Sequence, residues 1–221
     1  MVRNNAVVTH SKAHGRGEST HYFSANQTSV AKDRFLTLHA RGVVMKFVTQ
    51  SGMFSPLKID LGSLLLTEEA IVPKGSRVLD LGCGYGVVGI TLAKADPSLK
   101  VVLTDVNERA VACAQRNVGL NSVSVNVRKG DGFESVPEIF DSILLNPPQS
   151  AGKVVCERLI RESKEHLENS GTLQLVARHH KGGRALGEFM RSVFGNVSTG
   201  GKQSGYRIYY SKNSQVHLSS D

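Results

Sequence analysis

From Ser76 onward, short apolar runs rich in Val, Leu and Ile alternate with longer segments of mixed polar and apolar residues. The short runs are typical of buried strands, and the longer segments are typical of helices. We expect strands over residues 77–81, 100–105, 124–131, 140–146 and 171–177, and helices over residues 87–95, 107–120, 151–168 and 183–193.

This alternation predicts an α/β fold with a mostly parallel sheet and helices on both faces. The run from Ser142 to Leu145 is almost entirely apolar, as expected for a strand that is covered on both faces. Asn107 is placed to cap the helix that follows it, and Gly119 is placed to end that helix. Near the C-terminal end, NVST and YRIYYS flank the sequence GGKQSG, which predicts an antiparallel hairpin.

The chain has 221 residues, and we expect them to form three parts around one core. Residues 1–20 are polar and predict a flexible tail, residues 21–75 predict a strand-and-loop extension packed on the core, and residues 76–221 predict the main domain. No apolar run approaches the roughly 20 residues that cross a bilayer, and the first 20 residues contain no secretory apolar segment. We therefore expect a cytoplasmic protein without a membrane partner.

The formal net charge of +8 is unevenly distributed along the chain. Residues 1–60 carry 8 basic and 3 acidic side chains, residues 61–150 carry 8 and 10, and residues 151–221 carry 11 and 6. The two basic outer segments favour a partner made of phosphates, whereas the balanced middle suits another purpose. A basic solvated surface without any such partner is the alternative interpretation.

The three cysteines, Cys83, Cys113 and Cys156, are odd in number and widely spaced, and no CxxC pair occurs. This spacing argues against a disulfide framework and against a structural zinc site. We expect reduced, packed thiols and no metal.

Three alternating glycines follow Asp80 at the end of the strand predicted over residues 77–81, in the sequence DLGCGYG. Glycines at such a place let the backbone approach a ligand where a Cβ would collide. Residues 84–89 also satisfy GxGxxG, the dinucleotide fingerprint of dehydrogenases, but this match begins late, after Gly82. An acid at the strand end would repel a phosphate, and it suits a ligand with a cationic amino acid portion.

Asp105 stands at the end of the next predicted strand, 25 residues after Asp80. A carboxylate at this place can accept hydrogen bonds from both hydroxyls of a ribose. S-adenosylmethionine carries a ribose, an ammonium and a sulfonium, and it has no phosphate. The two acids therefore favour S-adenosylmethionine over a dinucleotide.

Asn146, Pro147 and Pro148 directly follow an apolar run, at the carboxyl end of a strand, where ligands bind in open α/β sheets. The prolines make the turn rigid, and the Asn carboxamide can point an acceptor into the pocket. Such an acceptor can hold an amino or amide nitrogen and aim it at a sulfonium methyl. We expect these three residues to be catalytic, in an in-line methyl transfer without a covalent enzyme intermediate.

Taken together, VLDLGCGYG, TDVN, GDG and LNPP resemble the ordered motifs of class I S-adenosylmethionine methyltransferases. The resemblance implies a Rossmann-like fold with a seven-stranded sheet, and it gives Asp131 a hydrogen bond to the adenine amino group. The segment IDLGS resembles a family segment that closes over the methionine end of the cofactor. The implied cofactor-binding residues are Asp60, Gly62, Asp80, Gly82, Cys83, Gly84, Gly86, Asp105, Val106, Asp131, Gly132 and Asn146.

Over about residues 20–212 the chain most resembles the ribosomal small-subunit guanine-N2 methyltransferase family, through segments such as HYFSANQTS, SGMFS, IDLGS and GYRIYYS. Bacterial members have two related halves, and this chain has room for the catalytic half alone, like the short archaeal members. The resemblance implies methylation of the exocyclic N2 amino group of a guanine. It implies ribosomal RNA or the assembling small-subunit particle as partner, and it leaves the oligomeric state open.

An RNA partner predicts cationic side chains near the site. The candidates are Arg158, Arg161, Lys181, Arg184 and Arg207. Gln149 stands where many amino-methylating relatives place an aromatic residue that stacks on the target base, and Phe54 is a candidate for an apolar contact instead. His179 and His180 either contact a phosphate or simply end a polar strand.

Two other functions remain open from the sequence. Asn-Pro-Pro turns also serve amide nitrogens, so a protein glutamine N5-methyltransferase is the alternative enzyme. A noncatalytic RNA-binding module is the alternative outside catalysis. The basic outer segments favour RNA over protein, and the joint presence of Asp80, Asp105 and Asn146 favours an enzyme.

Overall fold

The computed structural model describes residues 7–10, 33–50, 58–147 and 152–214. Its larger sheet has seven strands in the order β6-β5-β4-β7-β8-β10-β9. The first five strands in this order, β6, β5, β4, β7 and β8, run parallel to one another. Strand β10 is antiparallel to both of its neighbours. The strands are β4 (Arg77–Leu81), β5 (Lys100–Asp105), β6 (Val125–Lys129), β7 (Phe140–Leu145), β8 (Leu167–Arg178), β9 (Ser198–Gln203) and β10 (Tyr206–Lys212). This arrangement confirms the predicted sheet and its C-terminal hairpin.

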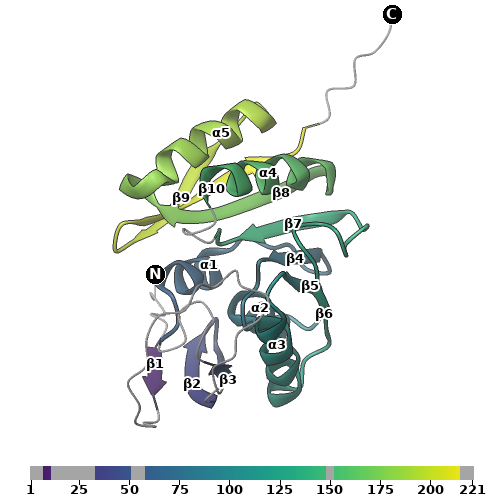
Figure 1. Ribbon diagram of the computed structural model, residues 1–221, viewed down its shortest axis with the longest axis vertical. Coiled ribbons are helices and arrows are strands. Elements are labelled where there is room, and N and C mark those ends of the chain that lie inside the picture. Colours follow the sequence, from purple (N-terminus) through teal and green to yellow (C-terminus); the bar gives the residue numbers. More distant parts are fainter. Residues whose placement is uncertain (1–6, 11–32, 51–57, 148–151, 215–221) are drawn as a thin grey trace, which may run out of the picture.

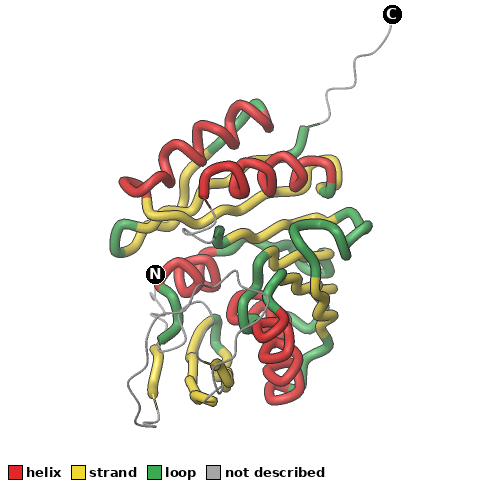
Figure 2. The backbone as a smooth tube through the Cα atoms, in the orientation of Figure 1, coloured by secondary structure: helices red, strands yellow, loops and turns green. Residues whose placement is uncertain are grey.

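Helices cover both faces of this sheet, as Figures 1 and 2 show. One face packs against α1 (Leu61–Glu69), α2 (Val87–Ala95) and α3 (Glu108–Asn121), and the other packs against α4 (Gly152–Glu165) and α5 (Arg184–Phe194). In β7, Leu144 joins the first core, whereas Ile143 and Leu145 join the second. Because these side chains alternate between two buried faces, the whole run is apolar.

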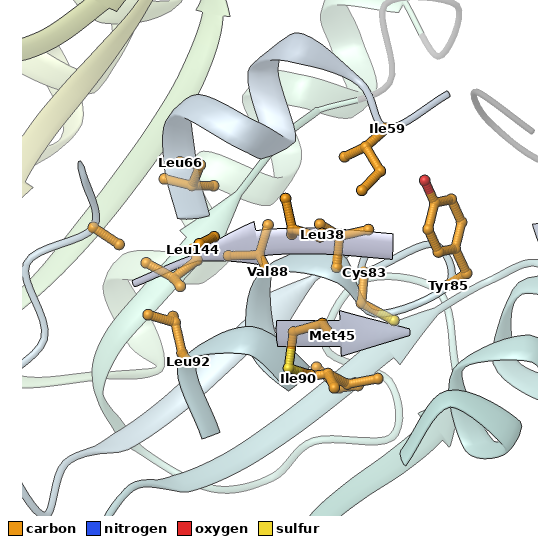
Figure 3. Packing of buried hydrophobic residues seen from close by; sticks show 14 of the residues in the cluster. Leu38, Met45, Ile59, Leu66, Cys83, Tyr85, Val88, Ile90, Leu92 and Leu144 are labelled. Atoms are coloured by element: carbon orange, nitrogen blue, oxygen red, sulfur yellow. The ribbon is translucent and has the colours of Figure 1, made fainter. Parts of the chain in front are cut away.

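The N-terminal extension forms a separate three-stranded antiparallel sheet of β1 (Val7–His10), β2 (Asp33–Ala40) and β3 (Val43–Gln50). Leu38 and Met45 project from this sheet toward Val88 and Ile90 of α2 (Figure 3). Strand β1 lies inside the segment for which a flexible tail was predicted. These four residues pair with β2 through the backbone, and the polar composition of the segment gave no indication of this pairing.

Helix α1 occupies residues that the sequence analysis assigned to strand and loop. Its leucine triplet lacks the spacing of an amphipathic helix, because Leu65 and Leu66 are both buried against other elements. Asp60 starts the helix by accepting a hydrogen bond from the Ser63 amide at 3.0 Å. The sequence analysis did not recognise this cap, so the strand-and-loop prediction was wrong for these residues.

Three predicted boundaries were also wrong. Helix α3 passes Gly119 and ends at Asn121, and Ser122 caps it in the left-handed conformation with φ of 51°. Residues 200–203 belong to β9, and the hairpin turns at Ser204 and Gly205, both with positive φ. The helix expected through residue 168 ends at Glu165, and β8 begins at Leu167. No helix within the described ranges is long and apolar enough to cross a membrane.

The buried Asn117 of α3 joins β3 of the smaller sheet to the glycine loop after β4. Its Oδ1 accepts from the Val48 amide at 2.7 Å, and its Nδ2 donates to the carbonyl oxygens of Val48 and Tyr85, each at 2.9 Å. Replacing Asn117 by Ala leaves these backbone groups buried without partners, so we expect the free energy of unfolding to fall by about 3 kcal/mol. Urea unfolding measures this, with Asn126→Ala on the exposed face of β6 as the control. Equal stability of the two variants would contradict the assigned role.

Candidate active site

The strand order reverses at β4, which has β5 on one side and β7 on the other. In open α/β sheets a ligand binds outside the carboxyl ends of the strands at such a switch point. A pocket lies there, and it brings together most of the predicted cofactor residues: Asp60, Asp80, Gly82, Cys83, Gly84, Asp105, Val106, Asp131, Gly132 and Asn146.

The glycine loop between β4 and α2 bends through backbone conformations that favour glycine. Gly82 and Gly84 have φ of 70° and 57°, and a Cβ added at either would meet no protein atom within 4 Å. The space beside them is therefore open to a ligand. Gly86 caps α2 with φ of 90°, so it shapes the loop from outside the pocket lining.

Asp80 and Asp105 lie at neighbouring strand ends and are both almost fully buried. Asp80 accepts a hydrogen bond from the Gly89 amide, and Asp105 accepts from the amides of Gly84 and Asn107, each at 2.8 Å. Burial raises the pKa of Asp80 to about 7, and the negative charge of Asp105 contributes. The pair therefore favours a cationic ligand.

The lining of this pocket includes four aspartates, among them Asp60 and Asp131, and no Lys or Arg among its described residues. Such a lining repels a pyrophosphate, which argues against the dinucleotide interpretation. Thr104 also lines the pocket, and its hydroxyl is buried without a hydrogen-bond partner in the described part of the chain. A cationic nucleoside such as S-adenosylmethionine fits this set of acceptors and the open space beside the glycines.

The Asn146 side chain is held in one orientation at the mouth of this pocket. Its Nδ2 donates to Asp60 Oδ2 and to Ser63 Oγ, each at 2.9 Å. Asp60 Oδ1 accepts from the Tyr206 hydroxyl at 3.2 Å. Since both N–H bonds of the amide are used, the Asn146 side chain has only its Oδ1 left, and this oxygen is an acceptor.

Gly62 lies directly beside this group, in the first turn of α1. A Cβ at this residue would lie 2.8 Å from Asp60 Oδ2, 2.9 Å from the Tyr206 ring and 3.2 Å from Asn146 Oδ1. Its role is therefore to permit close packing around Asn146, although it does not line the pocket itself.

A second pocket shares Asn146 with the first and continues along Pro147. Its walls are mainly apolar, with Val176, Ala177 and Leu186 among them. Three cations, Lys153, Arg178 and Lys181, also line it. Asn146 thus stands between an acidic pocket and one with a basic lining.

The predicted RNA contacts are not gathered in one place. Lys181 lines the second pocket, and Arg207 lines a third cavity. Arg158 pairs with Asp131 at 2.6 Å and with Glu162 at 3.4 Å, which places it beside the first pocket. Arg161 lies over the Phe189 ring, and Arg184 pairs with Glu188. Phe54, Pro148 and Gln149 lie outside the described residues.

The three cysteines are buried and free, as expected. Burial raises the pKa of the Cys83 thiol, so this side chain is a packed group beside the pocket and not a nucleophile (Figure 3). Within the described ranges, His, Cys, Asp and Glu form no cluster that could hold a metal ion.

Sequence reasoning assigned no role to Ser63 and Thr104 of the first pocket or to Lys153 and Arg178 of the second. It also missed Tyr206, which donates a hydrogen bond to Asp60. The spacing of Asp60 and Ser63 at a helix start was a usable indication for the first of these. Tyr206 lies in the segment GYRIYYS, but nothing local in that segment indicates a bond to a residue 146 positions earlier.

Comparisons with known proteins agree with this geometry. The methyltransferase small domain family matches residues 44–210. The uncharacterized protein YbxB of Bacillus subtilis (strain 168) is 34% identical over 198 residues, which cover 88% of this chain and 98% of YbxB. Ribosomal RNA small subunit methyltransferase C of Stutzerimonas stutzeri (strain A1501) is 34% identical over 180 residues, which cover 80% of this chain and 53% of that protein.

Among solved structures, the T. thermophilus 16S rRNA N2 methyltransferase RsmC, in complex with AdoMet and guanosine, superposes with a TM-score of 0.71. The two are 24% identical, and the match covers 86% of this chain and 52% of RsmC. A methyltransferase from Pyrococcus furiosus has a TM-score of 0.62 at 21% identity, covering 74% of this chain and 90% of that one. The chain thus spans nearly all of YbxB and about half of the named ribosomal RNA methyltransferases.

The strand order and the similarity to RsmC define the class I methyltransferase fold that the sequence motifs predicted. The chain belongs to the methyltransferase small domain family. The predicted cofactor, S-adenosylmethionine, is the one present in the RsmC complex.

The raised pKa of Asp80 predicts a pH-dependent stability. The carboxyl of Asp80 has a pKa of 3.8 in the unfolded chain and about 7 in the folded protein, so folding favours the protonated acid. The free energy of unfolding of the wild type therefore falls as the pH rises from 3.8 to about 7. Relative to the wild type, Asp80→Asn should gain roughly 1.4 kcal/mol of stability per pH unit in this window and level off above it. Urea unfolding without cofactor, at several pH values between about 5 and 8, measures the difference.

The partly exposed Asp96 provides the control, because hydrogen bonds from Ser98 lower its pKa. For Asp96→Asn the difference from the wild type should stay flat over the same range. A flat difference for Asp80→Asn as well would show that Asp80 is ionised in the folded protein at all of these pH values.

Proposed function

We propose that the protein transfers a methyl group from S-adenosylmethionine to the exocyclic N2 amino group of a guanine in small-subunit ribosomal RNA. The observation that carries this proposal is the orientation of Asn146 between the acidic pocket and the second pocket. In the described part of the chain, no hydrogen-bond donor occupies Asn146 Oδ1, and this oxygen is the acceptor that an amino group requires.

When bound, S-adenosylmethionine supplies a methyl group whose bond to sulfur breaks as its bond to nitrogen forms, while the extra proton of the nitrogen passes to water. Asn146 Oδ1 accepts a hydrogen bond from one N–H of the target amino group. This bond orients the nitrogen so that the nitrogen lone pair points along the line of methyl transfer. Positive charge develops on that nitrogen, so the hydrogen bond to Asn146 strengthens toward the transition state. Asp60 and Ser63 act on this step only by holding the Asn146 amide.

The choice of RNA rests on two supports. Relatives at 34% identity are named ribosomal RNA small subunit methyltransferases, and RsmC, a structural neighbour of this chain, was solved in complex with AdoMet and guanosine. The second pocket has apolar walls suited to a base and the cations Lys153, Arg178 and Lys181 suited to its phosphates. A base has to leave its stack to reach Asn146, at a cost of a few kcal/mol that phosphate contacts offset.

The substrate is tested by offering S-adenosylmethionine with a labelled methyl group to two acceptors, small-subunit ribosomal RNA from cells that lack this protein and a protein with an exposed glutamine, such as a release factor. We expect label in the RNA, and nucleoside mass spectrometry should identify N2-methylguanosine. Label in the protein alone would overturn the RNA assignment in favour of glutamine methylation. Transfer to neither acceptor would overturn the proposal as a whole.

Removing the Asn146 carboxamide should separate catalysis from cofactor binding. We expect Asn146→Ala to lower kcat by about 100-fold or more, because the acceptor that aligns the amino group is lost. Its affinity for S-adenosylmethionine, measured by calorimetry, should stay within about threefold of the wild type, since Asp80 and Asp105 remain. Asn126→Ala serves as the matched control. Unchanged turnover of Asn146→Ala would remove this residue from the mechanism.

Asp105 provides the reverse case. The Asp105→Ala variant loses the carboxylate proposed to hold the ribose hydroxyls, and we expect cofactor affinity to fall by about 30-fold or more. Calorimetric titration with S-adenosylmethionine measures this, and NAD serves as the comparison ligand. Equal binding of the cofactor by the variant and the wild type would contradict the assigned contact, and tighter binding of NAD would contradict the cofactor.

A further inference from the structure

Neighbouring residues at the end of β8 and in the turn after it line different cavities. Arg178 and Lys181 line the second pocket, whereas His179 and His180 line a third cavity of about 200 Å³. The remaining lining comes from residues 202–207 of the β9–β10 hairpin. This lining includes Lys202 and Arg207, and none of its residues is an Asp or a Glu. The cavity is therefore a site of concentrated positive charge.

Lys202 and Arg207 are direct cross-strand partners in the hairpin. Like charges placed opposite one another destabilise an antiparallel pair. Lys202 is exposed and Arg207 is half-buried, so the repulsion is only partly screened by water. An anion held between the two side chains would remove this repulsion.

The histidine wall of the cavity is fixed before any ligand arrives. The His179 amide donates to the Gly205 carbonyl at 2.9 Å, and the His179 Nδ1 is hydrogen-bonded to the Tyr209 hydroxyl at 2.7 Å. Partial burial lowers the pKa of His179, and the positive charges of Arg207, His180 and Arg184 lower it further. Several cations therefore act on the same small region, and the ring that borders it cannot swing away.

This cavity adjoins the proposed catalytic group through Tyr206. The Tyr206 ring lines the cavity and lies under the Arg178 guanidinium, 5.1 Å from it. The Tyr206 hydroxyl donates to Asp60, the residue that holds Asn146. A polyanion that enters the second pocket beside Arg178 can therefore extend past Tyr206 to the third cavity.

We propose that the third cavity binds a backbone phosphate of the RNA substrate, next to the nucleotide that is methylated. The inference rests on the proposed function, since it assigns a subsite to the same substrate. Lys202 and Arg207 neutralise the phosphate, and the histidines supply further N–H donors. The contact fixes the position of the RNA and carries no base specificity.

The double variant Lys202→Ala/Arg207→Ala tests this assignment. The control is Lys74→Ala/Lys100→Ala, which removes the same charge at the opposite, amino end of the parallel strands. For an in vitro transcript of small-subunit ribosomal RNA, we expect about tenfold weaker binding by the test variant. The slope of log affinity against log salt should be shallower by about 1.4, for two lost contacts to a single strand.

Kinetics and stability provide readouts that a structural role would not move in this way. The test variant should show about a tenfold higher KM for RNA with kcat within about twofold of the wild type, because the phosphate contact is the same before and during transfer. Its melting temperature should equal or exceed that of the wild type, since a repulsive pair is removed. The control variant should match the wild type in affinity, in salt slope and in KM.

Three outcomes would overturn the proposal. Equal RNA affinity of the test and control variants would remove the phosphate site and leave the proposed function intact. An equal loss of binding to polyglutamate would identify a general anion surface instead of an RNA subsite. A wild-type protein that neither binds nor methylates the RNA would refute the proposed function, and the subsite with it.

Discussion

The carboxylate of Asp60 is the interaction on which the arrangement of the candidate site depends. It caps α1 through the Ser63 amide, accepts the Tyr206 hydroxyl from β10, and holds the Asn146 amide after β7. Three segments that are far apart in the sequence are thereby fixed at one point. The Asn146 amide donates one N–H to Asp60 and the other to the Ser63 hydroxyl. Its oxygen, Oδ1, is therefore left as an acceptor in a fixed orientation.

The electrostatic character of the pockets changes across Asn146. On one side, Asp80 and Asp105 make a buried acidic pocket that suits a cationic cofactor. On the other side, Arg178 and Lys181 line a pocket that suits an anionic substrate. Under the proposed function, such a separation favours discrimination between a cationic cofactor and an anionic substrate, because each is repelled from the site of the other.

Much of this organisation could be predicted from local sequence. Alternating apolar runs predicted the strands, and Asn107 was recognised as a helix cap, because both depend on neighbours along the chain. The glycine loop, Asp80, Asp105 and Asn146 could be placed together for a further reason. Residues at the carboxyl ends of parallel strands necessarily meet at one edge of the sheet, so their proximity follows from the fold class.

What the sequence determined by itself is therefore the α/β fold, the acids and glycines at the strand ends, and the class of methyltransferase. Only the tertiary structure decided which distant side chains meet them. It paired Arg158, a candidate RNA contact in the sequence analysis, with Asp131, and it brought Tyr206 to Asp60. These contacts depend on the docking of helices and hairpins onto the sheet, and no periodicity within one segment encodes that docking.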